Sequence, residues 1–184
     1  STAVGRINSY PGEVRSPVKL VGFRRLMTVQ RWRTSAPSIP QCPDHRLYQN
    51  PSMRAVVQRV TSARVTVDGR LVAAIEHGLL VLVGIARDDD ATAAAYLANK
   101  IVGLRVFEDA DHRFNRSVRD VEGAVLLVSQ FTLYGDCRRG RRPSFDQAAP
   151  PVEARAVYAA LTDAVRAYGV SVQTGEFQAH MAVE

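Results

Sequence analysis

An apolar run ends abruptly in polar residues at positions 123–133, which read Gly123-Ala124-Val125-Leu126-Leu127-Val128-Ser129-Gln130-Phe131-Thr132-Leu133. The run up to Val128 is typical of a buried strand. A buried strand that ends on Ser, Gln and Thr presents hydroxyls and backbone N–H groups at the end of a sheet, where ligand sites often form. A strand that ends in an ordinary loop has the same pattern, so the rest of the chain has to decide between the two.

Charge divides the 184 residues into two unlike segments. Residues 1–52 hold eight of the 24 basic and two of the 18 acidic side chains, so they account for the whole formal charge of +6. The charges of residues 53–184 cancel. The high pI is therefore no evidence that the second segment binds nucleic acid.

The first segment also holds six of the nine prolines and shows no sustained strand or helix period. We expect residues 1–52 to be a disordered or loosely attached extension, and residues 53–184 to be one compact domain that begins at Met53. The basic, acid-poor composition suits an organelle transit peptide. A start assigned too far upstream, or a leader added for expression, explains it equally well.

Two cysteines form no disulfide framework or zinc spacing, and the apolar runs are too short for a membrane helix. These features favour a reducing compartment, so we expect a cytoplasmic protein, with organellar targeting by residues 1–52 as the alternative. We expect no membrane association, and no protein partner is legible in the sequence.

The second segment predicts an α+β fold with about seven strands and two helices. Asp88-Asp89-Asp90 predicts the capped start of a helix over about 91–104, although three adjacent carboxylates also suggest a metal site. Pro150-Pro151 and Gly169 delimit a second helix, and Asp68-Gly69 predicts a hairpin turn. Strands are expected at 55–60, 63–67, 71–75, 79–85, 105–107, 123–130, 170–174 and 177–183, with a polar excursion at 109–119.

The usual catalytic motifs are absent from the sequence. His77, His112 and His180 are isolated, and Cys137 is favoured as an incidental loop residue over a reactive thiol. One basic cluster, from Gly135 to Phe145, directly follows the polar end of the 123–130 strand. Its arginines are as consistent with a solvated loop as with contacts to the phosphates of an acidic ligand.

Several motifs in order along the chain resemble the D-aminoacyl-tRNA deacylase family, over nearly all of residues 53–184. They are Met53-Arg54-Ala55-Val56-Val57-Gln58-Arg59-Val60, Gly78-Leu79-Leu80-Val81-Leu82-Val83-Gly84-Ile85, Ser129-Gln130-Phe131-Thr132-Leu133, Arg142-Pro143-Ser144-Phe145 and Thr174-Gly175-Glu176-Phe177-Gln178-Ala179-His180-Met181. The resemblance implies a single domain of mostly antiparallel, barrel-like sheet with two helices. It also implies hydrolysis of the ester that joins a D-amino acid to the terminal adenosine of tRNA, and the family's related activity on mischarged glycyl-tRNA.

Members of this family are homodimers that use no metal or cofactor and form the active site at the dimer interface. By the resemblance, the catalytic pocket is made by Ser129, Gln130, Phe131 and Thr132. Phe177 and Met181 match positions that line the adenine pocket, and Arg142, Pro143, Ser144 and Phe145 match a further substrate-binding motif. The partner is the aminoacyl end of tRNA.

The family's second signature, an Asn-x-Gly-Pro-Val segment with a cis Gly-Pro peptide, is expected shortly after Glu184, where the sequence stops. In the family this segment excludes L-amino acids. We therefore expect either a fragment of a longer protein, which the upstream matches favour, or a variant without chiral selectivity.

Two chemical interpretations of Thr132 remain. As a nucleophile its hydroxyl would need an adjacent base, and the sequence offers no obvious one. We favour backbone N–H groups near Phe131 and Thr132 that stabilise an oxyanion, with water or a ribose hydroxyl taking part. The rival functions are a tRNA-end binding protein without turnover, and a structural domain whose arginine loop binds phosphate incidentally.

Overall fold

The computed structural model describes residues 5–8, 53–138 and 140–184. The helices are α1 (Ala91–Gly103) and α2 (Pro151–Ala167), with a 3-10 turn η1 (Phe131–Tyr134). The strands are β1 (Gly5–Asn8), β2 (Arg54–Val60), β3 (Ala63–Val67), β4 (Arg70–Ile75), β5 (Gly78–Gly84), β6 (Phe107–Glu108), β7 (Phe114–Arg116), β8 (Ala124–Ser129), β9 (Val172–Thr174) and β10 (His180–Val183).

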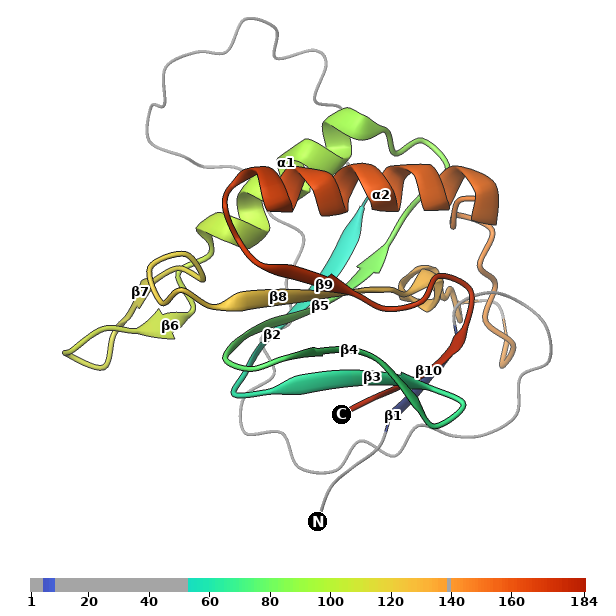
Figure 1. The fold of residues 1–184 in the computed structure, drawn as a ribbon. Helices are drawn as coiled ribbons and strands as arrows, with labels where there is room; N and C mark the ends of the chain where they lie inside the picture. Colours follow the sequence, from blue (N-terminus) through green and yellow to red (C-terminus); the bar gives the residue numbers. More distant parts are fainter. Residues whose placement is uncertain (1–4, 9–52, 139) are drawn as a thin grey trace, which may run out of the picture.

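These elements stack in three layers (Figure 1). A four-stranded sheet in the order β2-β5-β8-β9 lies in the middle. Helices α1 and α2 cover one of its faces, and the second four-stranded sheet, β1-β10-β3-β4, lies against the other. The two-stranded β6-β7 sheet forms an arm at one end.

Strands β5 and β8 are buried on both faces, because each lies inside the middle sheet. Leu79 and Leu127 belong to the core shared with the helices, whereas Leu80 and Leu126 belong to the core between the sheets. All four side chains are at most 8% exposed. This explains why both strands are continuous apolar runs in the sequence instead of alternating apolar and polar residues.

The α+β class with two helices is confirmed, as is the predominance of antiparallel pairing. Five of the seven described strand pairings are antiparallel, and β8 runs parallel to both β5 and β9. The predicted barrel is not closed. In the described residues β2 and β9 remain the edges of the middle sheet, and the two sheets pack face to face instead of joining.

The predicted hairpin turn at Asp68-Gly69 and the predicted cap at the start of α1 are confirmed. Asp68 and Gly69 both have positive φ, at 49° and 79°, in the turn between β3 and β4. Asp90 is the N-cap of α1, where its carboxylate accepts a 2.9 Å hydrogen bond from Ala93 N. The neighbouring Asp89 carboxylate accepts from Ala86 N at 2.6 Å. These aspartates therefore cap backbone groups, as the preferred interpretation predicts.

Several predicted boundaries are wrong. Residues 105–107 do not form a strand; β6 begins at Phe107, and its partner β7 lies inside the predicted polar excursion. Of the strand expected at 177–183, only residues 180–183 form a β-strand. Residues 5–8 pair with β10, although the sequence predicts no regular structure there; the rest of the 1–52 extension lies outside the described residues. In each case pairing with a distant segment, not local pattern, sets the outcome.

Leu127→Ala tests the doubly buried strand. The Leu127 side chain is 0% exposed, so its removal leaves a cavity and should lower the free energy of unfolding by about 2–5 kcal/mol. The matched control is Leu71→Ala on β4, where the side chain is 58% exposed and the expected change is within about 0.5 kcal/mol. Urea unfolding of both variants measures the difference, and equal losses would contradict the layered core.

Candidate functional site

The candidate site begins where β8 ends between two parallel neighbours. The Gln130 N–H donates to Val83 O of β5 at 2.6 Å, and Gly175 N, just after β9, donates to Leu127 O at 2.9 Å. Parallel strands end at the same edge of a sheet, so the ends of β5, β8 and β9 meet here. Ser129 and Gln130 are buried at this edge, at 5% and 7% exposure.

Directly after β8 the chain enters the 3-10 turn η1 (Figure 1). Phe131 is buried in this turn, and Thr132 is exposed. The Leu133 N–H donates to Gln130 O, and Gly135 N donates to Thr132 O at 3.0 Å. The Thr132 N–H stands in the first turn, where no preceding carbonyl of the same turn is available to accept from it. Because Thr132 is exposed, a donor of this kind can meet a ligand oxygen.

The Gln130 side chain determines how the Thr132 hydroxyl can act. Gln130 Nε2 donates a short hydrogen bond to Thr132 Oγ1. A hydroxyl that accepts from an amide keeps its own proton for donation elsewhere. Among the described residues Gln130 is the only hydrogen-bond partner of this hydroxyl, and an amide is no base. The geometry thus favours Thr132 as a donor over Thr132 as a nucleophile.

The other end of the same amide is unsatisfied. Gln130 Oε1 is buried and has no hydrogen-bond partner within the described residues. An unpaired buried acceptor costs free energy unless water or a ligand satisfies it. This atom belongs to the same side chain that contacts the exposed Thr132, so the polar end of β8 has an acceptor that water or a ligand could satisfy.

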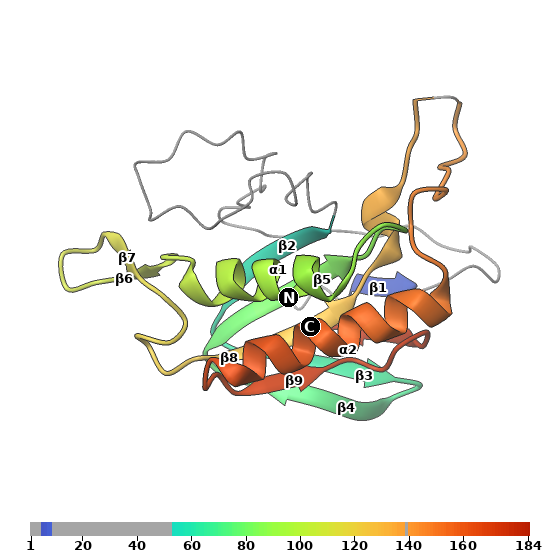
Figure 2. The ribbon, with the colours of Figure 1, turned by 90° about the horizontal axis from the view of Figure 1, so that it is seen from above.

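The basic loop, residues 135–146, leaves η1 and projects from the body (Figure 2). Its base is closed by two backbone hydrogen bonds between Asp136 and Ser144, at 2.8 and 3.0 Å. Phe145 packs edge-on against Phe131, with ring centroids 4.9 Å apart. The predicted Arg142-Pro143-Ser144-Phe145 motif is therefore anchored against the predicted catalytic segment.

Charge within the basic loop is only partly neutralised. Arg138 hydrogen-bonds to the Asp136 carboxylate and lowers its pKa from 3.8 to about 2. Arg141 and Arg142 are exposed and make no ion pair with any described residue. The Ser144 hydroxyl instead donates to the Asp146 carboxylate at 2.6 Å. Two guanidinium groups in the projecting loop thus form no ion pair with the described residues.

The two predicted adenine contacts lie in different surroundings. Phe177 is half-buried against α2. Its ring centroid lies 5.9 Å from that of Tyr158, and the Arg155 guanidinium lies over its face. Met181 is 1% exposed in the core between the sheets, and its Sδ lies close against Gly175. Of these two side chains, only the Phe177 ring offers exposed surface to a ligand. A contact with Met181 would require the side chains around it to move.

Three residues that sequence patterns do not single out hold η1 in place. Tyr134 is buried under the turn, and burial raises the pKa of its phenol. Gly84 lies so close to η1 that an added Cβ would stand 2.9 Å from the Tyr134 ring. Arg54 donates to Leu133 O at 2.7 Å. Arg54 and Gly84 do lie in the family motifs, but nothing in the sequence shows that they meet at η1.

Two clefts in the described structure lie away from this site. One of about 510 Å³ is bordered by the end of α1, the turn at 117–120 and Tyr168. Another of about 210 Å³ lies between α2 and Thr174. Neither is lined by Ser129, Gln130, Phe131 or Thr132, so the candidate site is separate from both clefts.

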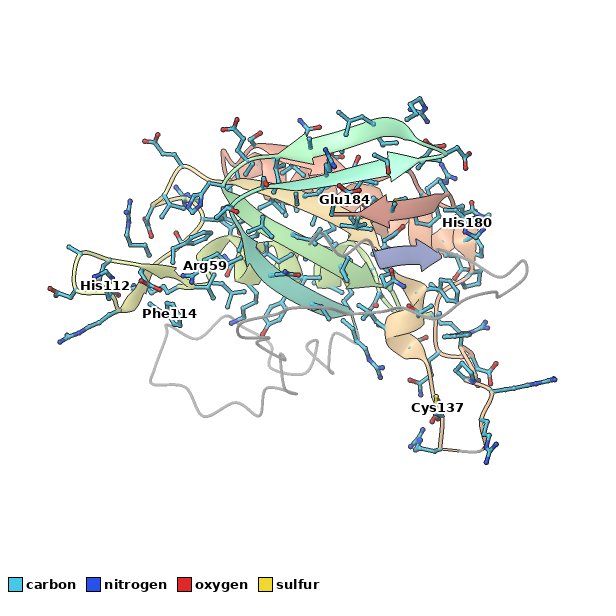
Figure 3. The ribbon with its side chains drawn as sticks, turned by 90° about the horizontal axis from the view of Figure 1, so that it is seen from below. Arg59, His112, Phe114, Cys137, His180 and Glu184 are labelled. Carbon is cyan, nitrogen blue, oxygen red and sulfur yellow. The ribbon has the colours of Figure 1, made fainter. Side chains whose placement is uncertain are left out.

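Other candidate chemistry lies away from η1 or is missing from the described part of the chain. Cys137 sits in the basic loop, while His112 and Phe114 sit on the β6-β7 arm at the opposite end of the molecule (Figure 3). Within the described ranges no three His, Cys, Asp or Glu side chains gather as a metal site would require. In the same ranges, neither helix has the length and apolar character needed to cross a bilayer.

Comparisons with known proteins agree on one family. Residues 56–184 match the family described as D-Tyr-tRNA(Tyr) deacylase. A D-aminoacyl-tRNA deacylase from Symbiobacterium thermophilum is 58% identical over 132 residues, which are 72% of this chain and 87% of the relative. The enzyme of the same name from Heliobacterium modesticaldum is 59% identical over 132 residues, covering 72% of this chain and 88% of the relative.

Two solved structures have the same fold. One, named c-Myc DNA Unwinding Element Binding Protein, superposes with a TM-score of 0.66 at 38% identity, covering 71% of this chain and 89% of that chain. The second, a probable eukaryotic D-amino acid tRNA deacylase, has a TM-score of 0.61 at 18% identity, covering 72% of this chain and 92% of that chain.

The charge state of the basic loop supplies a testable prediction. Removing the guanidinium in Arg138→Ala should raise the pKa of Asp136 from about 2 toward 3.8, because the carboxylate loses its main hydrogen-bond donor. The Asp136–Arg138 pairing should therefore persist above pH 3.8 and be lost as the pH falls through about 2. Carboxyl ¹³C shifts followed against pH measure this, with Arg141→Ala as the control that should leave Asp136 unchanged.

Proposed function

Because the chain belongs to the D-Tyr-tRNA(Tyr) deacylase family, we propose that it hydrolyses the ester of D-aminoacyl-tRNA, releasing a free D-amino acid and tRNA. Proofreading of mischarged glycyl-tRNA is a second substrate class that the same site would accept. The observation that carries the proposal is the exposed Thr132 at the end of a buried parallel strand, with a hydroxyl that accepts from Gln130 Nε2 and so keeps its own proton for donation.

The chemistry needs little more than position and charge stabilisation. An aminoacyl ester is already activated, so its carbonyl carbon can be attacked without a strong base. The oxygen of water, or of a ribose hydroxyl, adds to that carbon, and the carbonyl oxygen becomes an oxyanion. The ester C–O bond then breaks, and the departing ribose oxygen takes the proton that the attacking oxygen loses. When the attacking group is a ribose hydroxyl, a water molecule subsequently releases the amino acid.

The residues around η1 supply the parts of this reaction. The Thr132 N–H and hydroxyl would hydrogen-bond to the oxyanion, and Phe131 would line the pocket beside them. Ser129 and Gln130 would shape the pocket, and the free Gln130 Oε1 would accept a hydrogen bond from the substrate. No titratable group takes part.

The rest of the predicted site would hold the nucleic acid. Phe177 offers a partly exposed ring on which an adenine can stack. Met181 would line the inner side of the adenine pocket, behind Phe177. In the basic loop Arg142 would contact phosphates, while Pro143, Ser144 and Phe145 hold the loop in position.

Assembly and location complete the proposal. The protein acts as a homodimer whose active sites form at the interface, with edge strand β2 and its half-buried Val56 and Val57 available for pairing with a second copy. The reaction takes place in the cytoplasm, because charged tRNA is present in that compartment. No metal or cofactor is required by this chemistry.

Incubation of the protein with D-tyrosyl-tRNA, and separately with L-tyrosyl-tRNA and glycyl-tRNA, tests the function. Release of amino acid from the D ester and not from the L ester supports selective editing. Release from both esters means that hydrolysis occurs without chiral selection. No release from any ester at micromolar enzyme would overturn the proposal.

Binding without turnover is the second candidate function. Two observations favour it: the solved structure at 38% identity is named as a DNA-element binding protein, and Arg141 and Arg142 in the basic loop are exposed and unpaired among the described residues. Tight binding of tRNA with no release of amino acid supports this candidate. Weak, strongly salt-dependent binding with no preference for the acceptor end would indicate only incidental phosphate contacts.

Replacements at residue 132 separate its two donors. Thr132→Ala removes the hydroxyl together with the γ-methyl, and we expect hydrolysis to fall by less than about 10-fold, because the backbone donor remains. Replacing the residue with its α-hydroxy acid analogue turns the amide into an ester and deletes the N–H. The expected loss is then roughly 100- to 1,000-fold in kcat. Single-turnover hydrolysis of D-tyrosyl-tRNA measures both. Complete loss in Thr132→Ala with an unchanged fold would instead support the nucleophile.

A further inference from the structure

The exposed side of η1 is held by a residue far away in sequence. Arg54, the first residue of β2, donates from Nη1 to Leu133 O at 2.7 Å across 79 positions. Its guanidinium also lies over the Tyr134 ring, 4.5 Å from the centroid. A planar guanidinium can donate in its plane and stack on an aromatic face at once, which Lys cannot. One side chain thus contacts both a carbonyl and a ring at the C-terminal end of the turn.

The ladder explains why Arg54 can reach η1. Arg54 is the cross-strand partner of Gly84 on β5, so the side chain of Arg54 has no neighbouring side chain opposite it. An added Cβ at Gly84 would stand 3.1 Å from Leu133 Cβ and 3.2 Å from Gln130 O. Because Gly84 has no side chain, η1 packs directly against β5, within reach of the Arg54 guanidinium.

The covalent turn transmits this contact to the candidate donors. Leu133 O belongs to the residue immediately after Thr132, and Leu133 N–H donates to Gln130 O. The first bond closes the turn around the Thr132 N–H, and the bond from Arg54 holds the peptide that follows Leu133. Together they leave little freedom to the Thr132 peptide. Donor placement matters, because a shift of about 1 Å at an active site can cost roughly 100-fold in rate.

We propose that Arg54 is a positioning residue that clamps η1 so that the Thr132 donors face the reacting carbonyl. This inference rests on the proposed function for its effect on hydrolysis. It assigns no contact between Arg54 and the substrate. The alternative role of an exposed arginine is a contact with an RNA phosphate, which would alter binding instead of turnover.

Kinetics of Arg54→Ala test the clamp against that alternative. A clamp lowers kcat for D-tyrosyl-tRNA by roughly 10- to 100-fold and leaves KM within about two-fold. Guanidinium ion at low millimolar concentration should restore part of kcat to this variant, and Arg54→Lys should be intermediate. The control is Arg166→Ala on α2, which removes an exposed arginine that pairs with Asp163 on the same helix and should leave both constants unchanged. An unchanged kcat, or a change in KM alone with a smaller salt slope, overturns the proposal.

Hydrogen exchange tests the clamp without any activity. In Arg54→Ala the Leu133 and Gly135 amides should exchange at least several-fold faster, while the β8 amides remain as protected as in the wild type. Unchanged exchange at Leu133 and Gly135 overturns the clamp even if the wild type hydrolyses D-tyrosyl-tRNA. Faster exchange in this variant, when the wild type hydrolyses no ester, supports the clamp and overturns only the proposed function.

Discussion

Strand β8 pairs in parallel with both β5 and β9, and this pairing sets the layers and the position of the candidate site. It buries β8 on both faces, so that Leu127 packs toward the helices and Leu126 toward the second sheet. It also brings three strand ends to one edge. The polar residues after Val128 can stand there only because backbone partners on both sides, Val83 O and Gly175 N, satisfy the end of the strand.

From this edge the chain has to turn, and the 3-10 turn η1 is how it does so. The turn leaves the Thr132 N–H without a carbonyl acceptor inside η1, while Phe131 and Tyr134 are buried. The proposed chemistry uses that leftover hydrogen-bonding capacity. Gln130 makes the Thr132 hydroxyl an acceptor from the protein and a donor outward. A site of this kind depends on the rigid placement of its donors more than on a titratable base. The contacts that hold η1 are therefore expected to affect the rate of hydrolysis.

Parts of the candidate site followed from residue patterns. The abrupt end of the apolar run placed Ser129, Gln130 and Thr132 at a sheet end, and the adjacent arginines placed the basic loop beside them. Other parts could not be found this way. Tyr134 looks like an ordinary apolar-run residue, and Arg54 is one of many arginines; only their meeting across the fold gives them a role. Met181 shows the converse, since its predicted contact surface is buried in the core.

By itself the sequence determined the two helices, the cap at Asp90 and the Asp68-Gly69 turn, because these depend on neighbours within a few positions. It also determined the family through collinear motifs. Only the tertiary structure decided that the sheets stack instead of closing a barrel, that β7 forms inside a polar stretch, and that η1 rests on Gly84 under Arg54. These outcomes depend on pairing between distant segments, whose geometry no local pattern encodes.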